Sequence, residues 1–298
     1  GMTDDTKYAS VINQWKRDLT VRDRNTREYF YEAYKSNVNL VAATCSICGS
    51  KQLQEIYKYL FGNNKNAFDV VIMDEASQAL LAMFAASNKI GKRKLWVGDT
   101  AQLGPVLSLN DNRVKSNLFD DFKEGFRTLT TKRIYPTYQL TATFRLTQRS
   151  ANYTGYFYNG TLISKSTINP IVLNSFSKIL NSNGGPTLVL TDMEVGDTAP
   201  KYAVDMATYF VYAILKEPQI EIAVLTCLRK TTRVLQEAIA LRLGLGNKVM
   251  IETIARVQGL TTDITLFFIP NASLNRSLEA RLFNVATSRA KSHTIIIA

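Results

Sequence analysis

The feature that most constrains this sequence is a regular alternation of short apolar segments with amphipathic helical segments. In the first half, strands are predicted at 39–43, 68–73 and 94–97, with helices through residue 60 and over 77–88. Segment 68–73 is apolar at nearly every position, which is typical of a parallel strand covered on both faces. Strands of this kind that alternate with helices predict an α/β fold built on parallel sheets.

The same alternation returns in the second half, after a polar stretch at 107–137 and a loop-rich stretch at 159–186. We predict strands at 187–190, 220–226, 249–253, 264–269 and 294–297, and helices over 200–216, 230–243 and 278–289. The start of the chain has apolar residues at helical spacing, which predicts a helix over 8–35. The resulting domain prediction is a helical lead-in at 1–36, a partial first α/β domain at 37–137 and a second at 138–298.

Composition narrows the class of partner. The 298 residues include 36 Lys and Arg against 25 Asp and Glu, a net charge of +11. This balance indicates a polyanionic partner, nucleic acid first, although simple solubility would explain it equally well. No apolar run approaches the roughly 18 residues of a membrane helix, so no membrane partner is expected. Three cysteines and one histidine argue against a disulfide framework and against a zinc site at Cys45 and Cys48. Reduced thiols and an acidic, polar start predict a cytoplasmic location.

Polar clusters follow three predicted strands of the first half, where ligands of parallel sheets bind. They are Thr44, the pair Asp74 and Glu75, and the segment 99–102. An acidic pair suits a nucleotide-bound Mg²⁺ and a carboxylate that activates water, and the alternative is an ordinary helix N-terminus that carries acids. Gln102 can orient water or sense a terminal phosphate, and the alternative is a glycine–proline turn.

These segments belong to an ordered set that resembles the motifs of superfamily 1 helicases, in the branch of RNA-surveillance helicases and related bacterial DNA helicases. The matching segments are the strand–Thr element 40–45, motif II at 71–78 (VIMDEASQ), motif III at 98–105 (GDTAQLGP), the start of the second RecA-like domain at 139–145 (QLTATFR) with 157–162, motif V at 257–263 (VQGLTTD) and motif VI at 284–291 (NVATSRAK). The resemblance implies two tandem RecA-like domains of the P-loop NTPase type, the first incomplete at its N-terminus.

The resemblance also implies roles at the nucleotide. Asp74 would coordinate Mg²⁺, Glu75 would activate the hydrolytic water, and Gln102 would contact the γ-phosphate. Arg145 and Arg289 would be arginine fingers, because a fixed guanidinium stabilises charge on a transferring phosphoryl group. The alternatives are a cation at a helix C-terminus for Arg289 and a surface charge for Arg145.

Five further residues follow from the same motifs. Asp99, Gln258 and Gly259 would belong to the nucleotide-binding surface, with the last two linking nucleotide state to the strand-binding surface. Thr44 and Thr253 would lie near the backbone of the single strand.

The sequence departs from the family pattern in two places. Motif V has Thr261 where the family usually has a glutamate that contacts ribose, and no segment fits the phosphate loop G-x-x-x-x-G-K-[ST]. We therefore predict that the chain does not hydrolyse ATP at a useful rate by itself. ATP and Mg²⁺ would bind only if an upstream part of the helicase core, or a partner chain, supplied that loop.

The function predicted from the sequence is an ATP-dependent helicase or translocase core on single-stranded nucleic acid, with DNA favoured over RNA. The alternative is a non-catalytic module that binds nucleic acid or regulates. A third and weaker interpretation is another nucleotide hydrolase with two RecA-type domains.

Overall fold

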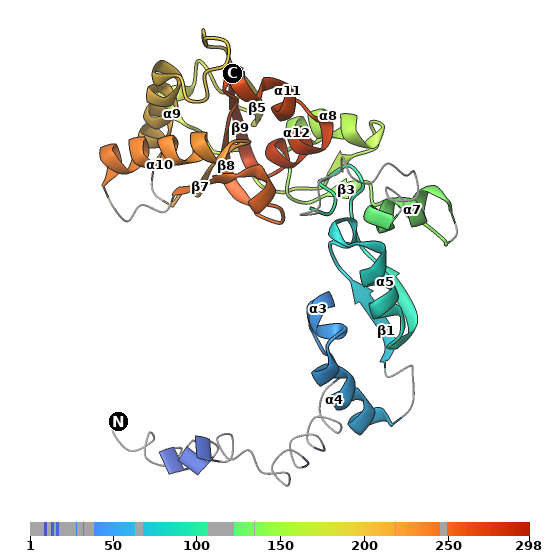
Figure 1. Ribbon diagram of the computed structural model, residues 1–298. Coiled ribbons are helices and arrows are strands. Elements are labelled where there is room, and N and C mark those ends of the chain that lie inside the picture. Colours follow the sequence, from blue (N-terminus) through green and yellow to red (C-terminus); the bar gives the residue numbers. More distant parts are fainter. Residues whose placement is uncertain are drawn as a thin grey trace. The chain divides into compact units, whose positions relative to one another are not determined.

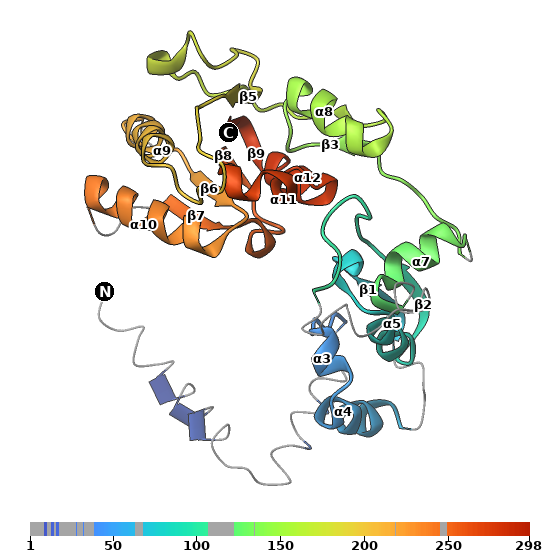
Figure 2. The same cartoon turned by 45° about the horizontal axis from the view of Figure 1, so that its top comes forward.

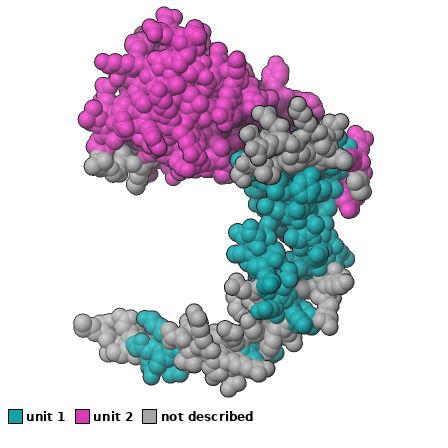
Figure 3. Space-filling view, in the orientation of Figure 1, with its two compact units in different colours: residues 1–98, 105–131 teal, residues 99–104, 132–298 magenta. Residues whose placement is uncertain are grey.

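The computed structural model describes residues 9–10, 13–14, 16–17, 28, 32, 39–62, 68–106, 122–133, 135–217, 219–244 and 249–298. The chain divides into two compact units (Figure 3): Gly1–Gly98 with Pro105–Thr131, and Asp99–Gly104 with Lys132–Ala298. Every strand pair in both units is parallel. The predicted α/β class with parallel sheets is confirmed, and each unit is described by itself below.

The first unit is built around a short parallel sheet of two strands (Figure 1). Its elements are α3 (Cys45–Cys48), α4 (Lys51–Phe61), β1 (Phe68–Met73), the 3-10 helix η1 (Ala76–Gln78), α5 (Leu81–Asn88), β2 (Gly91–Trp96) and α7 (Gly125–Thr131). Met73 and Trp96 pair across the sheet and pack with Phe84 and Phe126 on one face. On the other face Val70 and Ile72 are exposed.

Two predictions for the first unit need comment. The strand predicted at 39–43 is wrong: these residues form no ladder, and Leu40 is 83% exposed. A strand must pair its backbone groups with a neighbour, and in the described part of the chain the sheet of this unit consists of β1 and β2 alone. Of the helix predicted over 8–35, residues 9–10, 13–14, 16–17, 28 and 32 are described and are helical; the rest lies outside the described residues.

The second unit contains a five-stranded parallel sheet in the order β5-β9-β8-β6-β7 (Figure 2). Its larger elements are α8 (Gln148–Thr154), β5 (Gly185–Val189), α9 (Lys201–Ile214), β6 (Ile222–Thr226), α10 (Arg229–Leu243), β7 (Val249–Thr253), β8 (Thr262–Phe268), α12 (Ala280–Thr287) and β9 (Ala290–Ile297). The shorter ones are β3 (Ala142–Thr143), η3 (Gly155–Tyr158), β4 (Ile163–Ser164), η4 (Asn174–Phe176), η5 (Ile254–Arg256), η6 (Asn271–Ser273) and α11 (Leu274–Ser277). The five sheet strands agree with the predicted ones to within a few residues.

Alternating strand residues build a separate core on each face of this sheet. Val224 and Leu266 pack with α9 and α10 on one face. Ala223 and Phe267 pack with α12 on the other. The second unit is thus a sheet between two helical layers, and its central strands β6, β8 and β9 are buried at nearly every position because both faces are covered.

One short segment departs from the order of the sequence. Asp99–Gly104 follows β2 of the first unit but folds with the second, where Leu103 packs against the core beneath α12. The chain therefore passes between the units on both sides of this segment, in addition to the passage after Thr131. Among the described residues, none of the helices combines the length and hydropathy needed to cross a membrane.

Candidate functional site

The acidic pair lies in the turn that follows β1. Asp74 Oδ1 accepts a hydrogen bond of 2.9 Å from the Glu75 backbone N–H, and Glu75 Oε2 accepts one of 3.0 Å from the Gln78 side chain. Both carboxylates are exposed. Glu75 occupies the N-cap position of η1, as the alternative of an acidic helix N-terminus expects, but its side chain makes no capping bond. Two exposed carboxylates suit Mg²⁺, which keeps several waters and takes one or two carboxylates together with substrate phosphates.

Glu75 also has a strained backbone. Its φ is +50°, in the left-handed region, where a residue with a side chain costs of the order of 1 kcal/mol. The strain turns the chain sharply at the end of β1, so that Asp74 and Glu75 both stay outside the core that begins at Ala76.

In the second unit, Gln102 and Arg289 meet although 187 positions separate them. Arg289 is 2% exposed. Its Nη2 donates to Gln102 Oε1 at 2.8 Å, and its Nε donates to the Val285 carbonyl at 2.9 Å. The bond to the Val285 carbonyl is the one expected if Arg289 were simply a cation at the C-terminus of a helix. The bond to Gln102 joins motif III to motif VI, and the helix-end alternative does not explain it.

Gln102 is held by a partly buried polar network. Its Nε2 donates to Asp99 Oδ2 at 2.8 Å, and the Tyr158 hydroxyl donates to the same oxygen at 2.5 Å. Asn284 Nδ2 donates to the Tyr158 oxygen and to the Ala101 carbonyl, both at 3.0 Å. Burial, reinforced by the nearby Asp99 carboxylate, raises the pKa of Tyr158 well above its ordinary value. The phenol is therefore protonated over the whole neutral range and acts as a donor.

Sequence reasoning did not assign roles to Tyr158 and Asn284, although both lie inside matching motif segments. One signal was present: Asn284 is a polar residue on the buried stripe of a helix, between Leu282 and Val285. A fully buried amide is normally hydrogen-bonded, which indicates a specific polar partner at that position.

Arg145 lies close to the same chain segment. Its Nη1 donates to the Ser288 carbonyl at 3.3 Å, and its side chain is half-buried. The side chain is thus partly buried and has a backbone partner, which a plain surface charge does not require. The structure brings one guanidinium against the peptide that precedes Arg289, the other predicted finger.

Three buried polar atoms of motif V and motif VI have no partner: Gln258 Nε2, Asn284 Oδ1 and Ser288 Oγ. Gln258 Nε2 and Ser288 Oγ can donate a hydrogen bond, whereas the amide oxygen of Asn284 only accepts. Buried polar groups are normally satisfied, so two orphaned donors are an observation that fits phosphate oxygens. The adjacent Gly259 is exposed with φ +86° and has open space around its Cα.

The predicted strand-contacting threonines lie elsewhere. Thr253 ends β7 and pairs with Thr226 at the end of β6, whereas Arg289 comes just before the first residue of β9. The strands are parallel and rise about 3.3 Å per residue, so Thr253 and Arg289 lie at opposite ends of the sheet. Along the strand direction they are offset by roughly 25 Å. Thr44 belongs to the first unit and caps α3, its Oγ1 accepting from the Ile47 N–H at 3.3 Å. It does not end a strand as predicted.

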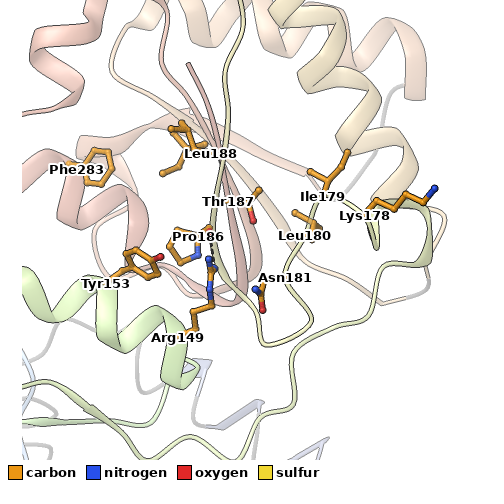
Figure 4. Close-up of a pocket in the computed structure, with 11 residues that line it drawn as sticks. Arg149, Tyr153, Lys178, Ile179, Leu180, Asn181, Pro186, Thr187, Leu188 and Phe283 are labelled. Atoms are coloured by element: carbon orange, nitrogen blue, oxygen red, sulfur yellow. Dashed lines mark hydrogen bonds between the residues drawn. The ribbon is translucent and has the colours of Figure 1, made fainter.

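The second unit also has a hollow of about 610 Å³ beside its edge strand β5 (Figure 4). It is lined by Arg149, Tyr153, Lys178, Ile179, Leu180, Asn181, Pro186, Thr187, Leu188, Phe283 and Ile296. Arg149 donates to the carbonyls of Gly184 and Pro186 at 3.1 and 2.7 Å. This guanidinium thus covers backbone acceptors at the sheet edge, and the lining of the hollow mixes apolar with polar side chains.

Comparisons with known proteins agree with the motifs at a coarse level. Residues 3–108 match the family described as AAA domain. No curated protein matches the chain.

Solved structures that are similar include the helicase nonstructural protein 10 of an arterivirus, with 17% identity over 76% of this chain and 38% of that one and a TM-score of 0.42. Its complex with DNA matches with 17% identity, the same coverage and a TM-score of 0.41. The C-terminal domain of a "possible DNA helicase" from Lactobacillus plantarum WCFS1 matches with 18% identity over 52% of this chain and 87% of that one, at a TM-score of 0.35.

This chain spans 38% of the length of the arterivirus protein. The AAA-domain match covers the segments that carry motif II and motif III, and the remaining motifs follow in order. The chain is thus similar to superfamily 1 helicases.

Proposed function

We propose that this chain is part of an ATP-dependent helicase or translocase core that acts on single-stranded nucleic acid, with DNA ahead of RNA. The observation that carries the proposal is the 2.8 Å bond between Gln102 and Arg289. A residue that senses a terminal phosphate and a guanidinium that stabilises phosphoryl charge are useful together only if they act on one group. Here they are in contact inside one compact unit.

The residues present fit part of an ATP–Mg²⁺ site. Asp74 would hold the metal, and Glu75 would accept the proton of the attacking water. Arg145, Arg289 and the orphaned donor of Gln258 would face phosphate oxygens. Bound ATP would supply the phosphoryl group whose transfer drives movement along the strand.

The 298 residues contain no phosphate loop, so the main ligands of the β- and γ-phosphates would come from an upstream part of the helicase core or a partner chain. One face of the first unit supports this partner. Val70, Ile72 and Leu95 are 48%, 62% and 52% exposed on the face of β1 and β2 opposite the core. Parallel sheets are covered on both faces, and a part that carries the loop would also cover this one.

The strand-binding role of Thr253 has a geometric argument. It lies at the end of the sheet opposite Arg289, so a nucleic-acid strand there would leave the phosphate-facing groups accessible. A polyanion is also the natural partner for a net charge of +11.

Two assays test the proposal on the chain as it stands. Fluorescence anisotropy with labelled single-stranded DNA and RNA should give binding that weakens roughly ten-fold between 50 and 200 mM salt, as expected for about three phosphate contacts. Binding that does not respond to salt, or no binding, would count against the proposal and favour a nucleotide hydrolase of another type.

The second assay measures phosphate release from ATP with and without the single strand. We expect no useful turnover from the chain alone. Clear turnover that Glu75→Gln abolishes would overturn the expectation that the loop must be supplied. Strand binding without any nucleotide effect, even when the loop-bearing part is added, would favour the non-catalytic module.

A further inference from the structure

We propose that Tyr158 and Asn284 are positioning residues that fix the segment 99–104 on the second unit and so hold Gln102 against Arg289. This deepens the proposed function and rests on it for its catalytic meaning. Both side chains act on Arg289 through their hydrogen bonds to this segment.

The segment 99–104 has an unusual place in the fold. Asp99–Gly104 lies between two stretches that belong to the first unit, yet it folds with the second. Leu103 packs on the core beneath α12, but one apolar contact is non-directional. Hydrogen bonds from the second unit must therefore define how the turn sits.

Those bonds come from two side chains. Tyr158, at the end of η3, donates to the Asp99 carboxylate at 2.5 Å. Asn284, on α12, donates to the Ala101 carbonyl and to the Tyr158 oxygen, both at 3.0 Å. One side chain holds the segment by a carboxylate, the other holds it by a backbone carbonyl, and the two are joined to each other.

The Asp99 carboxylate connects these bonds to Gln102. One oxygen of Asp99 accepts from the Ala101 N–H at 2.9 Å and closes the turn. Its other oxygen accepts from Gln102 Nε2 at 2.8 Å, which leaves the Gln102 amide oxygen directed at Arg289 Nη2. An amide with its nitrogen held on a carboxylate presents its oxygen in one orientation. The Tyr158 hydroxyl thereby influences the Arg289 guanidinium through Asp99 and Gln102.

Asp99 bears the negative charge of the network, so bonds to it are charge-assisted and stronger than neutral ones. Tyr158 contributes the shortest of them. Removing only its hydroxyl leaves the ring in place and takes away the donor that fixes the carboxylate. The turn then keeps Leu103 but loses its orientation.

The test compares Tyr158→Phe with Tyr156→Phe in the 298-residue chain. Tyr156 lies on the same short helix but is 85% exposed, which makes it a matched control. Hydrogen–deuterium exchange should show the amides of Ala101 and Gln102 exchanging about ten-fold faster in Tyr158→Phe, with the rest of the second unit unchanged. Asn284→Leu, which removes the donor and nearly keeps the volume of the side chain, should do the same.

A second measurement separates positioning from general stability. The side-chain ¹⁵N resonances of Arg289 should shift in Tyr158→Phe and in Asn284→Leu, and should stay as in the wild type in Tyr156→Phe. Unchanged exchange at 99–104 together with unchanged Arg289 resonances would overturn the proposal. Faster exchange spread over the whole second unit would overturn it too, because the role would then be structural. Neither measurement uses nucleotide or nucleic acid, so a failure to bind single strands would count against the proposed function alone.

Discussion

Replacing Gln102 by leucine removes the contact between the two motifs while nearly keeping the volume of the side chain. The lost bonds are the one from Arg289, at 2.8 Å to a guanidinium that is 2% exposed, and the one to Asp99, also at 2.8 Å. A hydrogen bond to a charged group contributes about 1.5–3 kcal/mol, and the bond to the half-buried Asp99 belongs at or below the low end of that range. We expect the second unit to lose about 3 kcal/mol, which for a domain of its size lowers the unfolding midpoint by roughly 6–12 °C.

The sequence supplies its own spectroscopic control for this measurement. The sequence of the second unit contains neither of the two tryptophans, and Trp96 belongs to the first unit. Tryptophan fluorescence therefore follows the first unit, whereas far-UV circular dichroism is dominated by the larger second one. Gln102→Leu should shift the dichroism transition and leave the fluorescence transition in place. Gln148→Leu, which breaks a bond between exposed side chains, should shift neither by more than about 0.5 kcal/mol. Equal midpoints for the two variants would refute the stable contact between Gln102 and Arg289.

Three further outcomes follow from the second unit. Gly184→Ala should destabilise it by about 2 kcal/mol or more, because φ is +72° and an added Cβ would lie 2.6 Å from the Ser292 carbonyl oxygen. Gly160→Ala, with the same φ but nothing within 4 Å, should cost about 1 kcal/mol; equal losses in thermal melts would contradict the steric argument. Burial lowers the pKa of His293 from 6.5, so the unfolded chain binds more protons than the folded one below about pH 6.5, and the free energy of unfolding should fall with acidification in that range. This dependence of stability on pH should be absent in His293→Gln, because the sequence has one histidine. Phe267→Ala, at a fully buried ring, should cost about 3–5 kcal/mol in urea titrations, and a loss below 1 kcal/mol would mean that the core beneath α12 is not packed as described.

Local pattern was enough to predict most of the second unit. Strand β6 and the C-terminal parts of β8 and β9 are apolar segments, as expected for strands that are buried on both faces. The same reasoning failed at 39–43, because a strand also needs a partner, and periodicity does not report whether one is present. The predicted positions of Asp74 and Glu75 after β1 are confirmed, since a strand end is a local property.

The site itself was only partly predictable. Motif resemblance singled out Gln102, Arg145 and Arg289 but not the contact between the first and the last. It gave no role to Tyr158 or Asn284, whose importance lies in what they bind. Hydrogen-bond partners 59, 126 and 187 positions apart depend on how the chain closes on itself, and no spacing rule in the sequence encodes that.

The sequence by itself determined the alternation of strands and helices, the polar residues at strand ends and the excess of positive charge, because each is a property of neighbouring residues. Only the tertiary structure decided that 99–104 folds with the second unit, that Gln102 meets Arg289, and that Thr253 lies at the opposite end of the sheet. The physical reason is that burial of apolar surface is non-directional and leaves many arrangements open, whereas specific long-range hydrogen bonds, such as those of Asp99, select one of them.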